Sequence, residues 1–184
     1  MIRLHAIYAK TNILAGSKVE TFMTTRPAYD DRPDIEKLRS QWNKINGIFE
    51  RGDEWSAAIV RAATAAEIAA NIAIRKRFEA ESEFTSEFVD SLLVWANGLD
   101  GKFTRLIIPA EPDEERKSAW KKLKKQAESL NSKRNKIVHR GSFASEKEAR
   151  RLVDVAHEVV IALVQPWEPG FSIERKRKPS KRKR

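Results

Sequence analysis

The chain has 184 residues, three histidines and no cysteine, and its formal net charge is +10. This length suits one domain with a real hydrophobic core. The lack of cysteine excludes disulfides, thiolate nucleophiles and Cys-based zinc sites, and three scattered histidines argue against a zinc cage, so we expect a protein without metal or cofactor.

The N-terminal residues carry no clear membrane or export signal. No apolar run approaches the roughly 18 residues that a membrane span needs, and the start MIRLHAIYAKTNILAG has too short an apolar core for a secretory signal. Residues 1–32, which run into the stretch RPAYDDRPD at residues 26–34, predict an extended or loosely ordered leader. We therefore expect a soluble, cytoplasmic protein that does not engage a membrane.

Helical periodicity begins after this leader. Apolar residues recur at helical spacing between Pro33 and Gly52 and predict a first amphipathic helix. An alanine-rich segment bounded by Asp53 is the longest helical signal in the chain, and its small side chains let neighbouring backbones approach closely. A shorter helix is predicted after Phe84, closing at residues 97 and 98, because Asn followed by Gly commonly ends a helix.

Two further helical regions follow. The charged segment that opens at Pro112 predicts one helix, or two with a break near Asn131. Ser145 and Glu148 form a capping-box pattern before a final apolar stripe that stops at Pro166. No segment predicts a convincing strand, so the expected fold is an all-α bundle of four to six helices over residues 33–167.

Most of the positive charge lies at the C-terminus. Residues 174–184, ERKRKPSKRKR, hold eight Lys or Arg and one Glu and contribute +7, which leaves +3 for the other 173 residues. Such a run repels itself and cannot bury surface, so residues 168–184 are predicted to be a disordered basic tail. An electrostatic arm for phosphate backbones is one interpretation. A solubility tail or a localisation signal fits the same composition.

The segment KRNKIVHRG, residues 133–141, contains the main candidate for a catalytic site. Five residues of ideal helix rotate by about 500°, so Arg134 and His139 would lie about 140° apart. One chain does not place both on one small ligand, whereas a two-fold axis through this segment would bring two of each together. The structural alternative is a packing or capping histidine, with the arginine paired to a nearby carboxylate.

Residues 134–139, RNKIVH, resemble the Arg-polar-x-x-x-His signature of HEPN domains, small helical bundles found in RNA-cleaving toxins, antiphage systems and RNA-processing factors. The resemblance covers about residues 35–165 and includes the alanine-rich helix with its internal Glu and the closing helix after HRG. It implies a HEPN-like bundle that acts as a metal-independent endoribonuclease in toxin or antiphage defence. It also implies a homodimer whose paired motifs cleave RNA by attack of the ribose 2′-oxygen on the adjacent phosphate.

The residues of this segment suit the implied chemistry. An imidazole titrates near neutral pH, so His139 could act as base in one protomer and acid in the other. Arg134 could hold the scissile phosphate through its planar fork of donors. Asn135 could orient Arg134 or bind a phosphate oxygen. The flanking cations expected to contact the RNA backbone, unless they mark a merely solvated face, are Lys133, Lys136 and Arg140.

Glu67 is the other residue that the sequence singles out. Thr64, Glu67 and Asn71 form a narrow polar stripe on the alanine-rich helix. A buried carboxylate needs a partner, and Arg134 is the natural candidate, so we expect a pair that fixes the guanidinium for phosphate. The alternative is that this stripe faces water.

One position departs from the family pattern. Some HEPN toxins carry a tyrosine two residues after the histidine, which a partner nucleotidyltransferase modifies, but Gly141 stands there in this chain. Control by that route is not supported, and an antitoxin or other protein partner would have to act elsewhere. His5 and His157 receive no role. A noncatalytic helical module that binds RNA or a protein through the same surface remains the alternative function.

Overall fold

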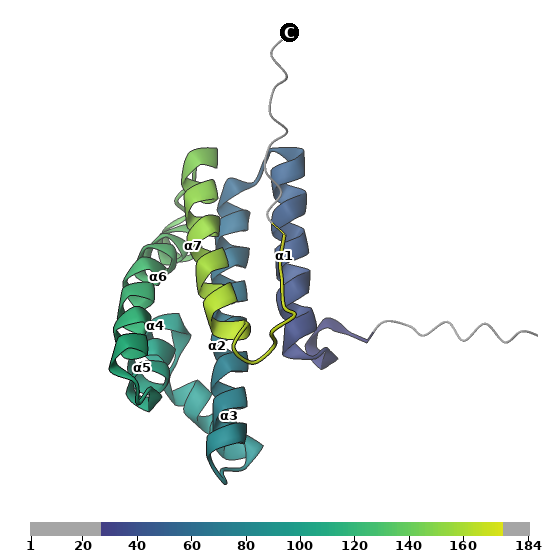
Figure 1. Cartoon of the computed structure of the whole chain (residues 1–184). Helices are drawn as coiled ribbons and strands as arrows, with labels where there is room; N and C mark the ends of the chain where they lie inside the picture. The colour runs from purple at the N-terminus through teal and green to yellow at the C-terminus, as the bar shows by residue number, and fades with distance from the viewer. Residues whose placement is uncertain (1–26, 175–184) are drawn as a thin grey trace, which may run out of the picture.

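The computed structural model describes residues 27–174, which are all-helical, as the sequence predicts. The long helices α1 (Asp34–Arg51), α2 (Trp55–Glu81), α6 (Glu114–Arg140) and α7 (Glu146–Val164) form the bundle (Figure 1). The shorter elements are η1 (Tyr29–Asp31), α3 (Ser86–Trp95), α4 (Gly98–Lys102), the π-helical turn η2 (Phe103–Ile107) and α5 (Ile108–Ala110). Most of these short elements connect α2 to α6.

Helix α2 is the centre of the bundle, and its most extensive contacts are with α1 and α7. Alanine favours the helix and leaves room for close helix packing. The larger side chains that complete the core come from the flanking helices, including Leu38, Trp42 and Ile45 on α1 and Val159, Val160 and Leu163 on α7. The fully buried alanines of α2 are Ala58, Ala62, Ala65, Ala66, Ala69 and Ala70.

Among the described residues, α2 alone is long and apolar enough to cross a membrane by length and composition. Its most apolar 18-residue window has a mean hydropathy of 1.5, and 56% of that window is buried inside the bundle. The central helix of a soluble bundle meets the same criterion, so this weak signal is compatible with the soluble protein that the sequence predicts.

Four helix ends meet at one end of the bundle, at the top in Figure 1. Helix α1 ends there at Gly52, and α2 begins there. Helix α6 ends and α7 begins at the same place, because the Ala144 amide donates to Ser56 Oγ at 2.9 Å, which ties the α6–α7 loop to the first turn of α2. We call this the motif end, since residues 134–140 form the last turns of α6.

The helix boundaries test the sequence interpretation in detail. Helix α6 is continuous through Asn131, so the charged segment forms one helix and not two. Ser145 caps α7, with its side chain accepting from the Glu148 amide, as the capping-box pattern predicts. The short elements between residues 98 and 110 were not expected.

The helical domain is longer at both ends than the predicted 33–167. Tyr29 joins the fold by accepting a hydrogen bond from Gln41 Nε2 at 2.6 Å. Phe171 is 3% exposed, so the assignment of residues 168–174 to a disordered tail was wrong, because this segment packs against the bundle. Residues 1–26 and 175–184, on which most of the leader and tail predictions fall, lie outside the described residues.

Candidate active site and nucleic-acid interface

The motif occupies the last two turns of α6, and local interactions define where this helix ends. Asp113 caps its start by accepting from the Arg116 amide at 2.7 Å. At its end Gly141 has a left-handed φ of 63°, a conformation that costs glycine little. The Gly141 amide donates to the Ile137 carbonyl at 3.1 Å, and the Ser142 amide donates to the Lys136 carbonyl at 3.2 Å. The backbone is therefore regular helix from residue 134 to residue 139.

Arg134 lies beside the core-facing side of α6, one turn after the buried Leu130, and is half-buried. Its Nη1 donates to Asn135 Oδ1 at 3.0 Å. Within residues 27–174 no carboxylate lies at ion-pair distance from this guanidinium. This hydrogen bond is compatible with the orienting role that the sequence suggested for Asn135, and it leaves the other donors of Arg134 without a carboxylate partner among these residues.

His139 lies on a different face of the same helix and is exposed. It makes no hydrogen bond or ion pair with the described part of the chain. Because α6 is regular here, Arg134 and His139 are separated by the expected angle of about 140° around the helix axis. A single chain does not bring the two groups together.

The arc of α6 between Arg134 and His139 carries an exposed apolar side chain. On a helical wheel Val138 and Asn135 lie within this arc, at about 40° and 100° from Arg134. Val138 is 49% exposed, and the nearby Phe143 in the α6–α7 loop is 89% exposed. We call Arg134, Asn135, Val138 and His139 the contact face, because a partner covering Val138 would touch both candidate catalytic groups.

Glu67 does not pair with Arg134, and this expectation is corrected. Its Oε1 accepts from Lys102 Nζ at 3.0 Å, and Lys102 on α4 is only 4% exposed. A buried ammonium needs a counter-charge, which the half-exposed Glu67 carboxylate supplies. Glu67 thus meets α4, whereas the Thr64 hydroxyl donates to the Val60 carbonyl of its own helix, and neither residue bonds to the motif.

Lys133, which the sequence suggested as a contact to the RNA backbone, forms contacts within the fold. Its Nζ lies 2.8 Å from Glu148 Oε2 on α7 and donates to the Phe143 carbonyl at 2.9 Å. It thereby braces the loop behind the motif and is engaged within the fold. Lys136 and Arg140 are exposed, and neither forms an ion pair with a described residue.

Three further lysines of α6, which the sequence interpretation missed, belong with these two. Like Lys136 and Arg140, they are exposed and form no ion pair at contact distance within residues 27–174, although the charge of Lys121 helps to lower the pKa of Glu114. At 100° per residue the five cations fall within an arc of about 100°, and His139 lies at one edge of it. A helical wheel of the segment would have found this pattern. We call this set the cationic face: Lys121, Lys122, Lys125, Lys136 and Arg140.

The other lysines of α6 lie outside this arc and are neutralised. Lys117 pairs with Glu114 at 2.6 Å. Lys124 lies 2.9 Å from Asp100 and 3.2 Å from Glu128, and hydrogen bonds to these two carboxylates raise its pKa. Unpaired cations therefore concentrate on the outer face of the helix that carries the motif.

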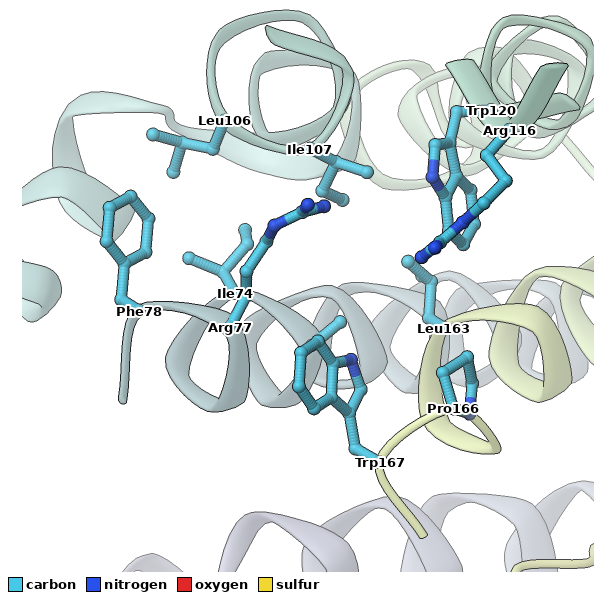
Figure 2. A pocket seen from close by; sticks show the side chains of 11 residues that line it. Ile74, Arg77, Phe78, Leu106, Ile107, Arg116, Trp120, Leu163, Pro166 and Trp167 are labelled. Atoms are coloured by element: carbon cyan, nitrogen blue, oxygen red, sulfur yellow. The ribbon is translucent and has the colours of Figure 1, made fainter. Parts of the chain in front are cut away.

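A small apolar pocket lies away from the motif (Figure 2). Its volume of about 40 Å³ is far below that of a typical ligand site. Arg77 and Arg116 line it beside Trp120, and these three side chains bind the fully buried Glu111 carboxylate at 3.2–3.4 Å. Burial alone would raise the pKa of Glu111, but hydrogen bonds from Trp120, the Asp113 amide and Arg77, with the charge of Arg116, lower it overall. This cluster stabilises the fold.

Across residues 27–174, no group of three or more His, Asp or Glu side chains is arranged to hold a metal ion. Comparison with known proteins adds no functional assignment: no family model, curated protein or solved structure matches this chain.

Proposed function

We propose that this chain is an endoribonuclease of the HEPN type, active as a homodimer without a metal, of the kind that serves toxin or antiphage defence. The observation that carries the proposal is the arrangement on α6. Arg134 is held by Asn135, His139 is exposed, and the cationic face begins beside His139. A phosphate-binding arginine, a free imidazole and a row of unpaired cations are the groups that metal-free RNA cleavage needs.

The reaction uses the 2′-hydroxyl of the substrate as the nucleophile. One His139 takes the 2′-hydroxyl proton as the 2′-oxygen bonds to phosphorus, and the P–O5′ bond breaks. The second His139, protonated, gives its proton to the leaving 5′-oxygen. Each proton transfer contributes about 10²–10⁴-fold. The products are a 2′,3′-cyclic phosphate and a 5′-hydroxyl, and the histidines finish with exchanged protonation states.

Arg134 supplies the positive charge that a metal ion provides in other nucleases. Its guanidinium donates two parallel hydrogen bonds to phosphate oxygens, which lysine cannot do. The Asn135 Oδ1 acceptor at 3.0 Å fixes the plane of this fork. Asn135 is therefore a positioning residue.

Dimerisation follows from the separation of the two groups. Because about 140° of helix surface divides Arg134 from His139, a second copy has to complete the site. The contact face offers the surface for it, since the exposed Val138 lies between the two groups around the helix. Packing two contact faces about a two-fold axis buries the Val138 side chain of each copy.

The test is RNA cleavage by the purified chain in EDTA, with the product ends mapped. We expect cyclic phosphate and 5′-hydroxyl ends, and no cleavage of DNA of the same sequence. His139→Ala and Arg134→Ala should each abolish cleavage while circular dichroism and thermal unfolding stay unchanged, because neither group is in the core. Arg134→Lys keeps the charge but should lose most activity. Wild-type cleavage by His139→Ala would refute the proposal.

A noncatalytic RNA-binding module is the second candidate, and the cationic face favours it because phosphate binding needs no imidazole. The same assays separate the two functions. The module binds RNA through Lys136 and Arg140 with no turnover, and His139→Ala leaves it unaltered.

A further inference from the structure

The chain does not leave the bundle where α7 ends. After a turn in which the Phe171 amide donates to the Glu168 carbonyl at 2.8 Å, residues 171–174 run as an extended strap along α1 (Figure 1). Phe171 anchors the start of the strap in the core, with the Arg39 guanidinium 5.0 Å from the centre of its ring. Gln165 Nε2 donates to the Phe171 carbonyl at 3.2 Å.

Side chains of the bundle bind the backbone of the strap along its length. Arg39 Nη1 donates to the Ser172 carbonyl at 3.2 Å, and His157 Nε2 lies 3.2 Å from the Ile173 carbonyl. At the last residue, the Glu174 carbonyl accepts from Trp42 Nε1 at 2.7 Å and from Asn46 Nδ2 at 3.2 Å. Every strap carbonyl from residue 171 to residue 174 thus has a side-chain partner, which fixes both the path and the direction of the segment.

The direction is toward the motif end. The partners on α1 advance from Arg39 to Trp42 and Asn46 as the strap advances, so the strap runs the same way as α1. Helix α7 travels away from the motif end for 19 residues, about 28 Å. The strap therefore brings the chain back toward the motif end. From Asn46 only five residues of α1 remain, about 8 Å.

The residues that follow Glu174 are the most basic in the chain. Residues 175–184, RKRKPSKRKR, contain eight Lys or Arg. Ten residues reach at most about 33–36 Å when fully extended. This length exceeds the about 8 Å of α1 that remain beyond Asn46, so the segment is long enough to reach the motif end.

We propose that the strap is a positioning device, which starts the basic segment 175–184 close to the motif end so that it binds the phosphate backbone of the same RNA. This inference rests on the RNA substrate of the proposed function, but not on cleavage. If the strap were released, the tether would begin at Gln165 and lengthen from about ten to about nineteen residues. The effective concentration of the segment near the bound RNA falls roughly as the −3/2 power of tether length. The gain in RNA affinity that the segment provides should therefore fall about threefold.

The first experiment is a binding cycle with the full-length protein and a 2′-O-methyl RNA, which lacks the attacking hydroxyl and is not cleaved. Four proteins are compared: wild type, a Trp42→Phe/Asn46→Ala strap variant, the chain ending at Glu174, and the combination. The strap variant keeps every charge of the chain. We expect it to bind more weakly than wild type by up to about threefold, since it frees the Glu174 carbonyl but keeps the Phe171 anchor, and we expect the same substitutions to have no effect when residues 175–184 are missing. Phe171→Ala serves as a second strap variant if the first lowers stability.

If truncation at Glu174 weakens RNA binding but the strap variants bind RNA as tightly as wild type, the positioning role of the strap is overturned, while RNA binding by the segment stands. An effect of equal size in the truncated chain would also overturn the positioning role, because the strap would then act without the segment. Failure of wild type to bind RNA would instead overturn the proposed function.

The second experiment needs no RNA. Because the chain has no cysteine, Ser180→Cys and Ser132→Cys create a unique pair for distance labels, one on the segment and one on the exposed side of α6. Release of the strap should lengthen and broaden the measured distance distribution. An identical distribution in wild type and both strap variants would show that the strap does not direct the segment.

Discussion

Replacing two lysines of the cationic face with glutamine should weaken RNA binding and make the RNA affinity less dependent on salt concentration. Lys121 and Lys125 lie one turn apart on α6, and about 21–27 Å of helix separates them from His139. A single-stranded RNA that crosses the motif and follows α6 passes over both. Each lost phosphate contact lowers the slope of log K against log salt by about 0.7, so Lys121→Gln/Lys125→Gln should lower it by about 1.4.

This slope corresponds to a measurable difference in affinity. Between about 50 and 200 mM salt, wild type should lose about sevenfold more affinity than the variant. Fluorescence anisotropy with labelled 2′-O-methyl RNA measures both slopes. The fold should be unaffected, since both side chains are exposed and glutamine is a good helix former.

A matched control removes the same charge elsewhere. Lys44→Gln/Lys76→Gln changes the net charge equally, but these two exposed lysines lie on α1 and α2. The control should leave the slope nearly as in wild type. Equal slopes in the two variants would refute the reasoning, because binding would then depend on net charge and not on the outer face of α6.

Three further outcomes are expected. Val138→Asp places a charge in the contact face, so it should yield a monomer by light scattering and abolish cleavage at micromolar protein, and a dimer of undiminished activity would contradict this assignment. Asn135→Ala should lower kcat less than Arg134→Ala while leaving RNA affinity intact, and an unchanged kcat would show that Asn135 does not position the guanidinium. Glu111→Gln should lower the free energy of unfolding by about 3 kcal/mol near pH 7, measured by denaturant titration. Because the pKa of Glu111 is lowered in the fold, the stability that its carboxylate contributes is fully present above the unfolded pKa of about 4.3 and is lost as the pH falls through the folded pKa. A stability difference between wild type and Glu111→Gln that stays constant down to about pH 3 would count against this role.

The long helices were predictable because their signals are local. Gly52 ends α1 in a left-handed conformation, and Ser145 caps α7 through its own side chain. Such features depend on residues within one or two turns, which the sequence displays directly.

The segment between α3 and α6 was not predictable in the same way. It combines α4, a π-helical turn and α5 within thirteen residues, so no helical period can develop. Gly101 packs so closely that a Cβ there would lie 2.6 Å from the Ala96 carbonyl oxygen. The segment also supplies Lys102, the true partner of Glu67. A tertiary ion pair of this kind depends on how distant helices meet, which periodicity does not encode.

The features of the candidate site that depend on local helix geometry were likewise predictable, and those that depend on tertiary contacts were not. The angle between Arg134 and His139 follows from helix geometry, and a wheel of α6 contains the cationic face. The use of Lys133 as a brace for the loop depends on where Glu148 of α7 comes to lie, so only the fold reveals it. The strap was missed because four residues without periodicity carry no signal, although the buried Phe171 marks it.

The central claim is that a 2′-hydroxyl attacks the adjacent phosphate between two His139 side chains. It is tested most directly with an end-labelled RNA that carries a single deoxyribose on the 5′ side of the mapped cut. The account predicts that the purified chain, in EDTA, leaves this bond intact while it cuts the all-ribose RNA. Cleavage of the substituted bond at the normal rate would contradict 2′-oxygen attack and the mechanism built on Arg134 and His139.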